Sequence, residues 1–399
     1  MEHYQVIIAG AGPVGSVAAY RLAERGIKVL LLESEPGVKE DMRASTFHAS
    51  TLEMMEELGV LDDLLAQGLK APVYQYLNRQ TGKALTLDLT EVADILKHPY
   101  RLQCEQFKLA RLLYKRLADH PNANVLYSHR VVHFSQDDKG VTVHAENPFE
   151  IAHFTGDYLI AADGASSLVR KWLGVKFEGF TYPEKFLTLS TEWPLEKHFD
   201  KLPYVSYVAD PTEWCVLLRV PTLWRVLVPA AESQSDEYLL SDEKKNAIFQ
   251  GLIGHGEEVK TKHRTIYRVH QRVATTFRVN RVLLAGDAAH LNNPLGGLGM
   301  NSGIHDVWNL TDKLLQIFQQ GGNADALLDL YDRQRRTIMN EFVQTQTIKN
   351  KKALETSAEN RQSQAESEMA RIVGDREARR NYMLEQSMHN SLKRAEALI

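Results

Sequence analysis

The stretch MEHYQVIIAGAGPVGSVAAYRLAERGIKVLLLESE, residues 1–35, opens the chain and decides how its first part folds. Its hydrophobic pattern predicts a buried strand over residues 4–9 and an amphipathic helix over residues 14–25. A second short apolar run predicts another buried strand over residues 28–32. The order strand, helix, strand within about 30 residues is typical of a βαβ unit in a parallel sheet.

The turn between the first strand and the helix carries Gly10-x-Gly12-x-x-Gly15. Gly10 permits a tight turn, Gly12 lets a pyrophosphate approach the backbone, and Gly15 lets the helix pack closely on the sheet. The helix N-terminus has a partial positive charge that suits a diphosphate. Glu33 ends the second strand, where a carboxylate accepts the ribose hydroxyls of an adenosine. The stretch predicts a bound dinucleotide without distinguishing NAD from FAD; the plain alternative is a glycine-rich turn without a ligand.

Composition sets the broad class of the protein. With 399 residues, the chain can bury a large core and form two associated domains. A formal net charge of −4 gives no reason to expect nucleic acid or an anionic membrane surface as a partner. The two cysteines, Cys104 and Cys215, form no CxxC motif, which favours a reduced, cytoplasmic setting. No apolar run approaches the length of a membrane span.

Two later stretches resemble the first, because each predicts a buried strand that ends at a glycine and a carboxylate. An apolar strand predicted over residues 158–162 ends at Asp163-Gly164, and another over 282–285 ends at Gly286-Asp287. The second of these leads through a glycine-rich loop into a helix predicted over residues 299–315. Ligands of open α/β sheets bind at the carboxyl ends of the strands. A chain with two such contact points fits a long, two-part cofactor better than NAD.

The domain plan follows from changes in pattern along the chain. Residues 1–174 and 276–345 are predicted to form the nucleotide-binding domain, with a β insertion at about 72–100. Residues 175–275 are rich in aromatic and β-branched residues and predict an antiparallel sheet domain. Residues 346–399 are highly charged and predict a helical tail, either exposed or packed in a dimer.

Three motifs together resemble the single-component flavin-dependent aromatic hydroxylases, the class typified by para-hydroxybenzoate hydroxylase. They are the glycine turn with Glu33, the run from Asp163-Gly164 to Arg170, and the run from Gly286-Asp287 to Asn301. The resemblance extends to about residue 345. It implies an α/β fold in which a Rossmann-like FAD-binding domain is interleaved with an antiparallel β-sheet substrate domain, followed by C-terminal helices.

The resemblance also assigns site residues. Local sequence leaves Arg43 open between a pyrophosphate contact and a solvated loop residue, and the resemblance favours the FAD contact. The implied cofactor-binding residues are Gly10, Gly12, Pro13, Val14, Gly15, Glu33, Arg43, Gln103, Asp163, Asp287, Gly297, Gly299, Met300 and Asn301. On the substrate side, the resemblance implies Arg219 as the anchor for a substrate carboxylate, Arg225 facing the flavin and Pro294 beside its ring. Tyr204 and Tyr207 are candidates for assisting phenol deprotonation.

The implied reaction is hydroxylation of a phenolic, aromatic-acid or heteroaromatic substrate. NAD(P)H would reduce FAD, and reduced FAD would add O2 to give a C4a-hydroperoxide. The partners are a small aromatic substrate and O2, with a homodimer as a candidate assembly and no metal. Two alternatives stay open at this point. One is a reductase or dehydrogenase of the same fold that inserts no oxygen, and the other is a non-enzymatic nucleotide-binding or assembly protein that uses the helical tail.

Overall fold

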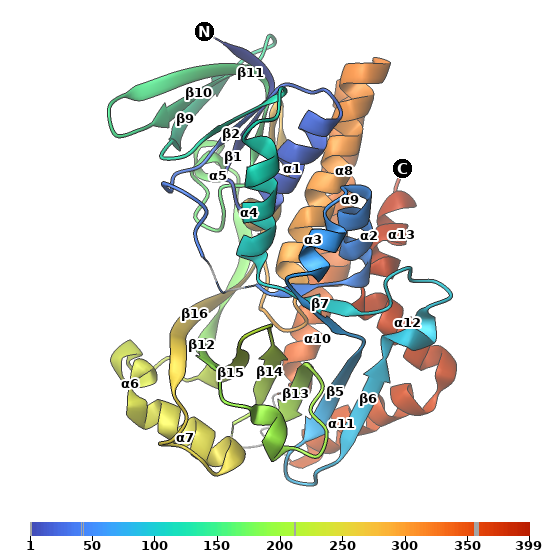
Figure 1. The fold of residues 1–399 in the computed structure, drawn as a ribbon. Coiled ribbons are helices and arrows are strands. Elements are labelled where there is room, and N and C mark those ends of the chain that lie inside the picture. Colours follow the sequence, from blue (N-terminus) through green and yellow to red (C-terminus); the bar gives the residue numbers. More distant parts are fainter. Residues whose placement is uncertain (1, 41, 43, 211–212, 355–358) are drawn as a thin grey trace.

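The computed structural model describes residues 2–40, 42, 44–210, 213–354 and 359–399, built around two large sheets (Figure 1). The first sheet has a parallel core in the order β18-β11-β1-β2-β8. Its strands are β1 (His3–Ala9), β2 (Val29–Leu32), β8 (Ala123–Leu126), β11 (Ile151–Ala161) and β18 (Val282–Leu284). Antiparallel strands extend it: β17 (Arg278–Val279) pairs with β18, while β9 (Arg130–Gln136) and β10 (Val141–Glu146) continue from β11. The α/β fold class predicted from the sequence is confirmed.

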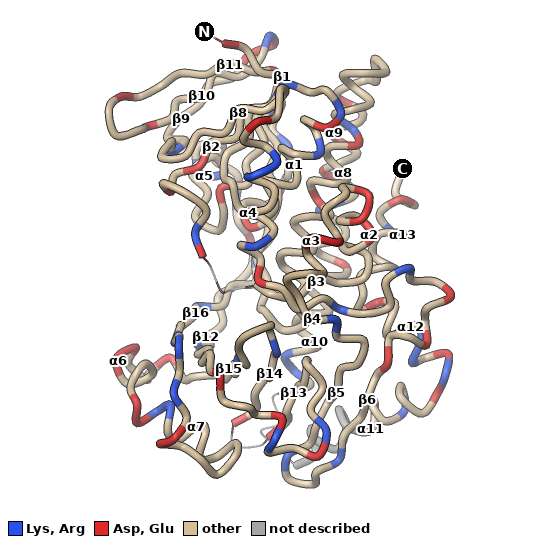
Figure 2. Tube along the Cα trace, viewed as in Figure 1, with Lys and Arg blue, Asp and Glu red and all other residues tan. Residues whose placement is uncertain are grey.

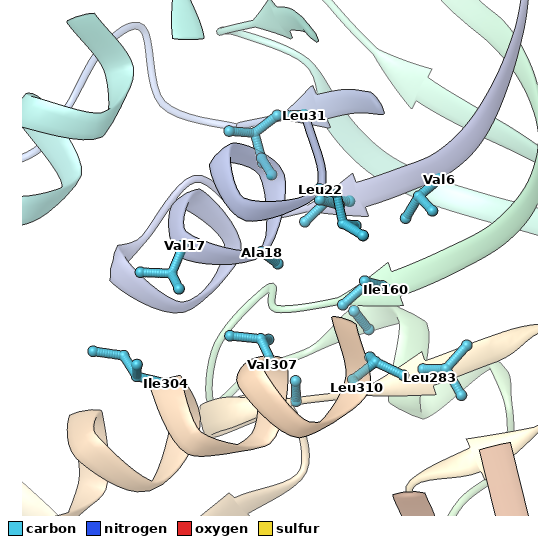
Figure 3. Packing of buried hydrophobic residues seen from close by; sticks show 14 of the residues in the cluster. Val6, Val17, Ala18, Leu22, Leu31, Ile160, Leu283, Ile304, Val307 and Leu310 are labelled. Atoms are coloured by element: carbon cyan, nitrogen blue, oxygen red, sulfur yellow. The ribbon is translucent and has the colours of Figure 1, made fainter. Parts of the chain in front are cut away.

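Helices cover this sheet and complete its core. The helix α1 (Pro13–Glu24) packs against both α4 (Gln106–Leu117) and α8 (Leu298–Gln320). Figure 3 shows Leu22 of α1 and Val307 of α8 near strand residues such as Val6 and Ile160. These side chains are fully buried. Burial of each such side chain contributes roughly 1.5–3 kcal/mol, so contact between apolar faces holds the helices on the sheet.

The parallel strands end side by side at one edge of the first sheet. Ala9 lies opposite Leu32 on one side and Ala161 on the other, and Ala161 lies opposite Leu284. The residues that follow these strand ends therefore gather at the same edge. This register brings together the three motifs that are far apart in the sequence, as expected for the carboxyl edge of an α/β sheet.

The second sheet has the strand order β19-β16-β12-β15-β14-β13-β5-β6. Its central strands are β12 (Phe177–Thr191), β13 (Val205–Ala209), β14 (Cys215–Arg219), β15 (Trp224–Ala230) and β16 (Thr261–Ala274), with β19 (His290–Leu291) at one edge. The hairpin of β5 (Val73–Asn78) and β6 (Ala84–Asp88) forms where predicted, but β5 pairs with β13. The prediction that residues 72–100 form an insertion of the first domain is wrong for this hairpin, because its pairing partner lies in the second sheet.

The chain also forms a small three-stranded sheet, whose strands lie on both sides of the β5–β6 hairpin in the sequence. It contains β3 (Thr46–Phe47), β4 (Leu69–Ala71) and β7 (Arg101–Gln103), with β7 in the middle. The helices α2 (Ala49–Glu57) and α3 (Leu61–Leu65) connect β3 to β4. Beyond the first sheet, α5 (Leu168–Trp172) precedes β12, and α6 (Asp236–Leu240) and α7 (Asp242–Ile253) precede β16.

The C-terminal helices pack back on the rest of the molecule. They follow α8 in the order α9 (Ala324–Ile338), a π-helical turn (Met339–Gln344), α10 (Thr345–Leu354), α11 (Glu359–Gly374), α12 (Arg376–Gln386) and α13 (His389–Glu396). In Figure 1, α13 lies beside α9, and α11 lies beside the β5–β6 hairpin. Met383 and Ala395 are buried. The prediction of an exposed tail is therefore wrong for α12 and α13, because each helix buries part of its surface against the protein.

Figure 2 shows acidic and basic residues interspersed, for example along α7 and around α12. In the part of the chain that the structure describes, no helix is both long enough and apolar enough to cross a membrane. The same residues include no group of three histidine, cysteine or acidic side chains that could hold a metal ion.

Candidate active site

One cavity of about 630 Å³ connects the carboxyl edge of the first sheet with a face of the second sheet. Its wall includes Gly12, Asp163 and Asp287 from the three motifs. The opposite part of the wall includes Tyr207 and Arg225 from the second sheet. A ligand that contacts the motifs therefore shares one cavity with a ligand that contacts the second sheet.

The glycines of the first turn have different roles. Gly10 has a φ of +99°, and a Cβ there would lie 2.4 Å from the backbone oxygen of Ala162. A Cβ at Gly15 would lie 1.9 Å from the backbone oxygen of Gly10. A Cβ at Gly12, by contrast, would meet no atom within 4 Å. Gly10 and Gly15 shape the turn, whereas Gly12, Pro13 and Val14 face the cavity and leave room for a phosphate.

Glu33 joins the end of β2 to the glycine turn. Its Oε2 accepts a hydrogen bond of 2.7 Å from the backbone N–H of Ala11. Its Oε1 accepts hydrogen bonds of 3.0 Å from the Ser34 hydroxyl and from the Glu35 N–H. Glu33 also lines the cavity, as predicted for a ribose-binding carboxylate. The carboxylate therefore fixes the turn and presents negative charge to the same space.

The second motif contributes a carboxylate and a cross-link. Asp163 lines the cavity; its Oδ2 accepts a 3.3 Å hydrogen bond from Val169 N, and its buried Oδ1 has no partner among the described residues. Burial raises the pKa of Asp163. Arg170 donates hydrogen bonds of 2.8 Å to the backbone oxygens of Ala165 and Ala288. Arg170 thereby ties the second motif to the third, while the unpaired Asp163 oxygen offers an acceptor to a bound ligand.

A buried ion network supports the third motif from behind. Asp306 of α8 accepts a 3.0 Å hydrogen bond from Gly286 N, the residue before Asp287. The same carboxylate bonds to His290 Nε2 at 2.6 Å and accepts a 2.8 Å bond from Arg335 Nε. His290 and Arg335 keep the pKa of Asp306 below its usual value although burial acts to raise it. His290 therefore shapes the turn, as the sequence favours, and Asp287 remains exposed to the cavity.

The loop before α8 brings Pro294, Gly297, Gly299 and Met300 to the cavity wall. Asn301 is buried and is not part of the wall. Its Nδ2 donates to the backbone oxygens of Gly297 and Thr46 at 2.7 and 2.8 Å, and its Oδ1 accepts from His48 N at 3.0 Å. The assignment of Asn301 as a cofactor contact is not supported by this placement, because both ends of its amide clamp the loop to β3.

Gln103 is similarly buried behind the wall. Its Oε1 accepts a 3.1 Å hydrogen bond from the Thr46 hydroxyl, and its Nε2 has no partner among the described residues. Thr46 and Gln106 line the cavity, whereas Gln103 does not. The structure thus places Gln103 next to the site rather than in its wall. Arg43 lies outside the described residues, so its predicted FAD contact stays a prediction.

The two predicted arginines of the second sheet lie on opposite faces. Leu218 is the register partner of Arg225, and Arg219 is the partner of Trp224. Because side chains alternate along a strand, Leu218 and Arg225 share the cavity face while Arg219 points to the other. Arg219 instead lies over the Trp224 ring, 5.7 Å from its centroid. The prediction of Arg219 as the substrate anchor is contradicted by this register.

The two candidate tyrosines also differ. Tyr204 precedes β13 and is 40% exposed, away from the cavity wall. Tyr207 is buried, lines the cavity and stacks on Tyr76 with ring centroids 4.9 Å apart. Tyr204 is therefore not placed to act on a ligand in this cavity, and Tyr207 is.

Sequence reasoning missed Arg101, which lines the cavity from β7 and is only 2% exposed. An arginine in the stretch HPYRLQ, residues 98–103, that leads into α4 was the available signal. Without knowledge of which side of β7 faces the second sheet, that signal could not be read.

These features fit a bound FAD. Helix α1 starts next to Gly12, which leaves open space, and the loop before α8 opens on the same cavity. Asp163 and Asp287 provide acceptors at two neighbouring strand ends. Helix N-termini bind phosphates, and carboxylates bind the hydroxyl groups of sugars.

Comparisons with known proteins agree with this geometry. The chain matches the family model described as FAD binding domain over residues 3–346. It is 32% identical over 341 residues to para-nitrophenol 4-monooxygenase of Pseudomonas sp. (strain WBC-3), covering 84% of each chain. It is 34% identical over 346 residues to 6-hydroxy-3-succinoylpyridine 3-monooxygenase HspB of Pseudomonas putida, covering 85% of this chain and 86% of that one.

A solved structure extends the likeness to nearly the whole chain. The crystal structure of p-nitrophenol 4-monooxygenase PnpA from Pseudomonas putida DLL-E4 superimposes with a TM-score of 0.91 at 28% sequence identity. The match covers 97% of this chain and 99% of that chain. It therefore includes most of the C-terminal helices beyond residue 346, where the match to the family model ends.

Proposed function

Because this chain belongs to the family described as FAD binding domain, we propose that it is a FAD-dependent monooxygenase that hydroxylates aromatic compounds with NAD(P)H and O2. The observation that carries the proposal is the single cavity. Residues of all three nucleotide motifs and of the cavity face of the second sheet line the same space. A cofactor and an aromatic substrate can therefore meet there.

The relatives favour oxygen insertion over the reductase alternative. The two relatives described above, in which the match covers most of both chains, are named as monooxygenases of a nitrophenol and of a hydroxypyridine. The class of flavin-dependent aromatic hydroxylase predicted from the sequence is thereby confirmed. The substrate of this chain is not given by its relatives' names, and we propose only its class, a phenol or hydroxylated heteroaromatic ring.

The chain's own residues bind the cofactor and shield the reaction. Gly12 and the N-terminus of α1 would receive the pyrophosphate, Glu33 the ribose, and Asp287 the ribityl chain. The loop from Pro294 to Met300 would lie along the flavin ring. Bound FAD supplies the two-electron chemistry that activates O2.

The substrate part of the cavity has a largely apolar wall. Val205, Val216 and Leu227 form an apolar face beside Tyr207. An apolar wall would hold the aromatic ring next to the cofactor and would limit the uncoupled side reaction that releases hydrogen peroxide. Tyr207 is the wall residue that we propose contacts a ring hydroxyl.

Three finer points are also proposals. Residues 1–174 without the β5–β6 hairpin form the FAD-binding domain together with residues 276–345, and residues 175–275 with that hairpin form the substrate domain. The protein functions in the cytoplasm, and it forms a homodimer. Light scattering of the purified protein measures the third point, and a monomer mass would contradict it.

The test of the proposed function uses the purified protein with bound FAD. A panel of phenols, aromatic acids and hydroxypyridines is scored for substrate-stimulated NAD(P)H oxidation under isotopically labelled O2. We expect at least one compound to stimulate oxidation and to gain one labelled oxygen atom. Oxidation of NAD(P)H with a reduced, unlabelled product would indicate a reductase instead. The control is the same reaction without substrate, which measures uncoupled oxidation.

A further inference from the structure

The guanidinium of Arg101 is a buried positive charge at the wall of the cavity. Arg101 is 2% exposed and lines the cavity from β7. Its Nη1 lies 3.4 Å from the Tyr207 hydroxyl oxygen, and its Cζ lies 4.1 Å from the centroid of the Tyr74 ring. Within the described parts of the chain, no carboxylate forms an ion pair with Arg101. Among the described residues, its direct side-chain contacts are therefore a phenol hydroxyl and a phenol ring.

These neighbours do not supply the missing negative charge. Burial raises the pKa of Tyr74 and of Tyr76 far above neutrality, so both phenols keep their protons. One cation–π contact and one long hydrogen bond offset less than the loss of hydration of a buried cation. Buried charges in proteins are normally paired. An anion that enters the cavity would provide the partner that the fold lacks.

The position of Arg101 places this charge where substrate and cofactor parts of the cavity meet. The strand β7 belongs to the small sheet, and its neighbour β3 carries Thr46 into the cavity wall. After burial, the charge of Arg101 is the second cause that lowers the pKa of His48, whose ring bonds to Gly296 O at 2.7 Å. Arg101 therefore lies near the loop before α8 while contacting Tyr207 of the second sheet.

The other buried arginine of the cavity wall is already engaged, and a third wall arginine, Arg268, is exposed. Arg225 donates a 3.1 Å hydrogen bond to the Ser45 hydroxyl and has a further interaction in the structure. Arg219 lies on the opposite face of the sheet. Arg101 and Arg225 are both buried at the cavity wall, but Arg225 is held by the Ser45 hydroxyl, whereas Arg101 contacts Tyr207, a residue of the substrate face of the cavity.

We propose that Arg101, together with the Tyr207 hydroxyl, binds a negatively charged oxygen group of the aromatic substrate. The group is a carboxylate or a phenolate, since both offer the oxygen lone pairs that a guanidinium and a hydroxyl bind. This inference rests on the proposed function, because it concerns the substrate of the same cavity. It defines the substrate class as anionic at the pH of the reaction.

The test measures ligand binding to the FAD-loaded protein without turnover. Flavin absorbance is titrated with benzoate and its neutral analogue benzamide, and with 4-nitrophenolate and its neutral methyl ether in alkaline buffer. We expect the parent protein to bind the anion at least about tenfold more tightly in one of the two pairs, a difference of about 1.4 kcal/mol. The pair that shows the preference distinguishes a carboxylate from a phenolate site.

Four variants assign the preference to Arg101. Arg101→Gln should abolish it, Arg101→Lys should restore part of it, and Tyr207→Phe should weaken anion binding about threefold to tenfold with little effect on the neutral analogue. Arg219→Gln is the control, an arginine removed from the face of the second sheet that points away from the cavity, and it should retain the full preference. Each variant is first checked for FAD content.

Two outcomes would overturn the inference. One is a parent protein without an anion preference in either pair. The other is an anion preference that survives in Arg101→Gln. If Arg101→Gln does not retain FAD, the second refuting outcome is instead that Tyr207→Phe binds the anion as tightly as the parent does. These readouts are separate from the test of the proposed function, because ligand affinity is measured without NAD(P)H and would persist in a protein that fails to hydroxylate.

Discussion

Two alanine substitutions in the same glycine turn should have opposite effects on the protein. Gly10→Ala places a Cβ 2.4 Å from a backbone oxygen, at a residue whose φ of +99° suits glycine. Gly12→Ala places a Cβ where no atom lies within 4 Å, at a residue with φ of −65° that alanine adopts freely. The first substitution therefore strains the fold, and the second only occupies empty space.

The magnitudes follow from these geometries. Backbone strain at Gly10→Ala should lower the free energy of unfolding of the apoprotein by about 1–3 kcal/mol, and movement of the crowded backbone adds to this loss. Gly12→Ala should leave that stability unchanged or raise it by about 0.4–1 kcal/mol, because alanine restricts the unfolded chain. The added methyl group would stand where a pyrophosphate approaches, so FAD affinity should fall at least about tenfold, or about 1.4 kcal/mol.

The assay compares both variants with the parent. Urea unfolding of the FAD-free protein measures stability, and quenching of FAD fluorescence on binding measures affinity. The reasoning is refuted if Gly12→Ala destabilises the apoprotein as much as Gly10→Ala does. It is also refuted if Gly12→Ala binds FAD like the parent, because the open space at Gly12 would then not be the phosphate site.

Three further predictions concern the cavity and its support. Asp287→Ala should weaken FAD binding about 10- to 150-fold by fluorescence titration, the scale of one charged hydrogen bond; unaltered affinity would contradict its role. Asp306→Asn should lower the free energy of unfolding by about 3–5 kcal/mol, because it leaves Arg335 buried without a counter-charge. Asp312→Asn is the control at a half-exposed ion pair, and it should lower the free energy of unfolding by at most about 1 kcal/mol. Equal urea midpoints would refute this contrast. Burial lowers the pKa of His48 from 6.5 to about 3. As the pH falls below 6.5, His48 is protonated in the unfolded chain but stays neutral in the folded chain. Stability should fall by about 2 kcal/mol between roughly pH 6.5 and 5 from this residue, and His48→Gln should flatten that part of the urea midpoint profile; an unchanged slope would contradict the assignment.

The sequence predicts the cofactor half of the site well because its signals are local. The glycine turn, Glu33 and Asp163 each stand directly at the end of a strand. Parallel strands bring such ends to one edge whatever the length of chain between them. A correct reading of each strand was therefore enough to place these residues around one cavity.

The substrate half depends on pairing that the sequence does not show. The side of the sheet that Arg219 faces is set by its register with Trp224, and a shift of one residue would reverse it. Arg101 lies in a strand of three residues, too short for a periodic pattern to indicate which side faces the second sheet. Buried apolar residues are sparse in α12 and α13, so helical composition alone suggested solvent exposure.

The contact between Tyr382 and Tyr76 has a consequence for how the protein is made. Their hydroxyl oxygens lie 2.8 Å apart although 306 positions separate them in the sequence. Tyr76 in turn stacks on Tyr207 at the cavity wall. Contacts over such separations form late, because the intervening chain must first be closed into a loop. During translation, the β5–β6 hairpin emerges early, its strand partner β13 emerges later, and α11 and α12 emerge later still, so part of its surface stays uncovered until those helices are made. We therefore expect nascent chains that end before α12 to aggregate or to require a chaperone, and FAD to bind only after synthesis has passed that helix.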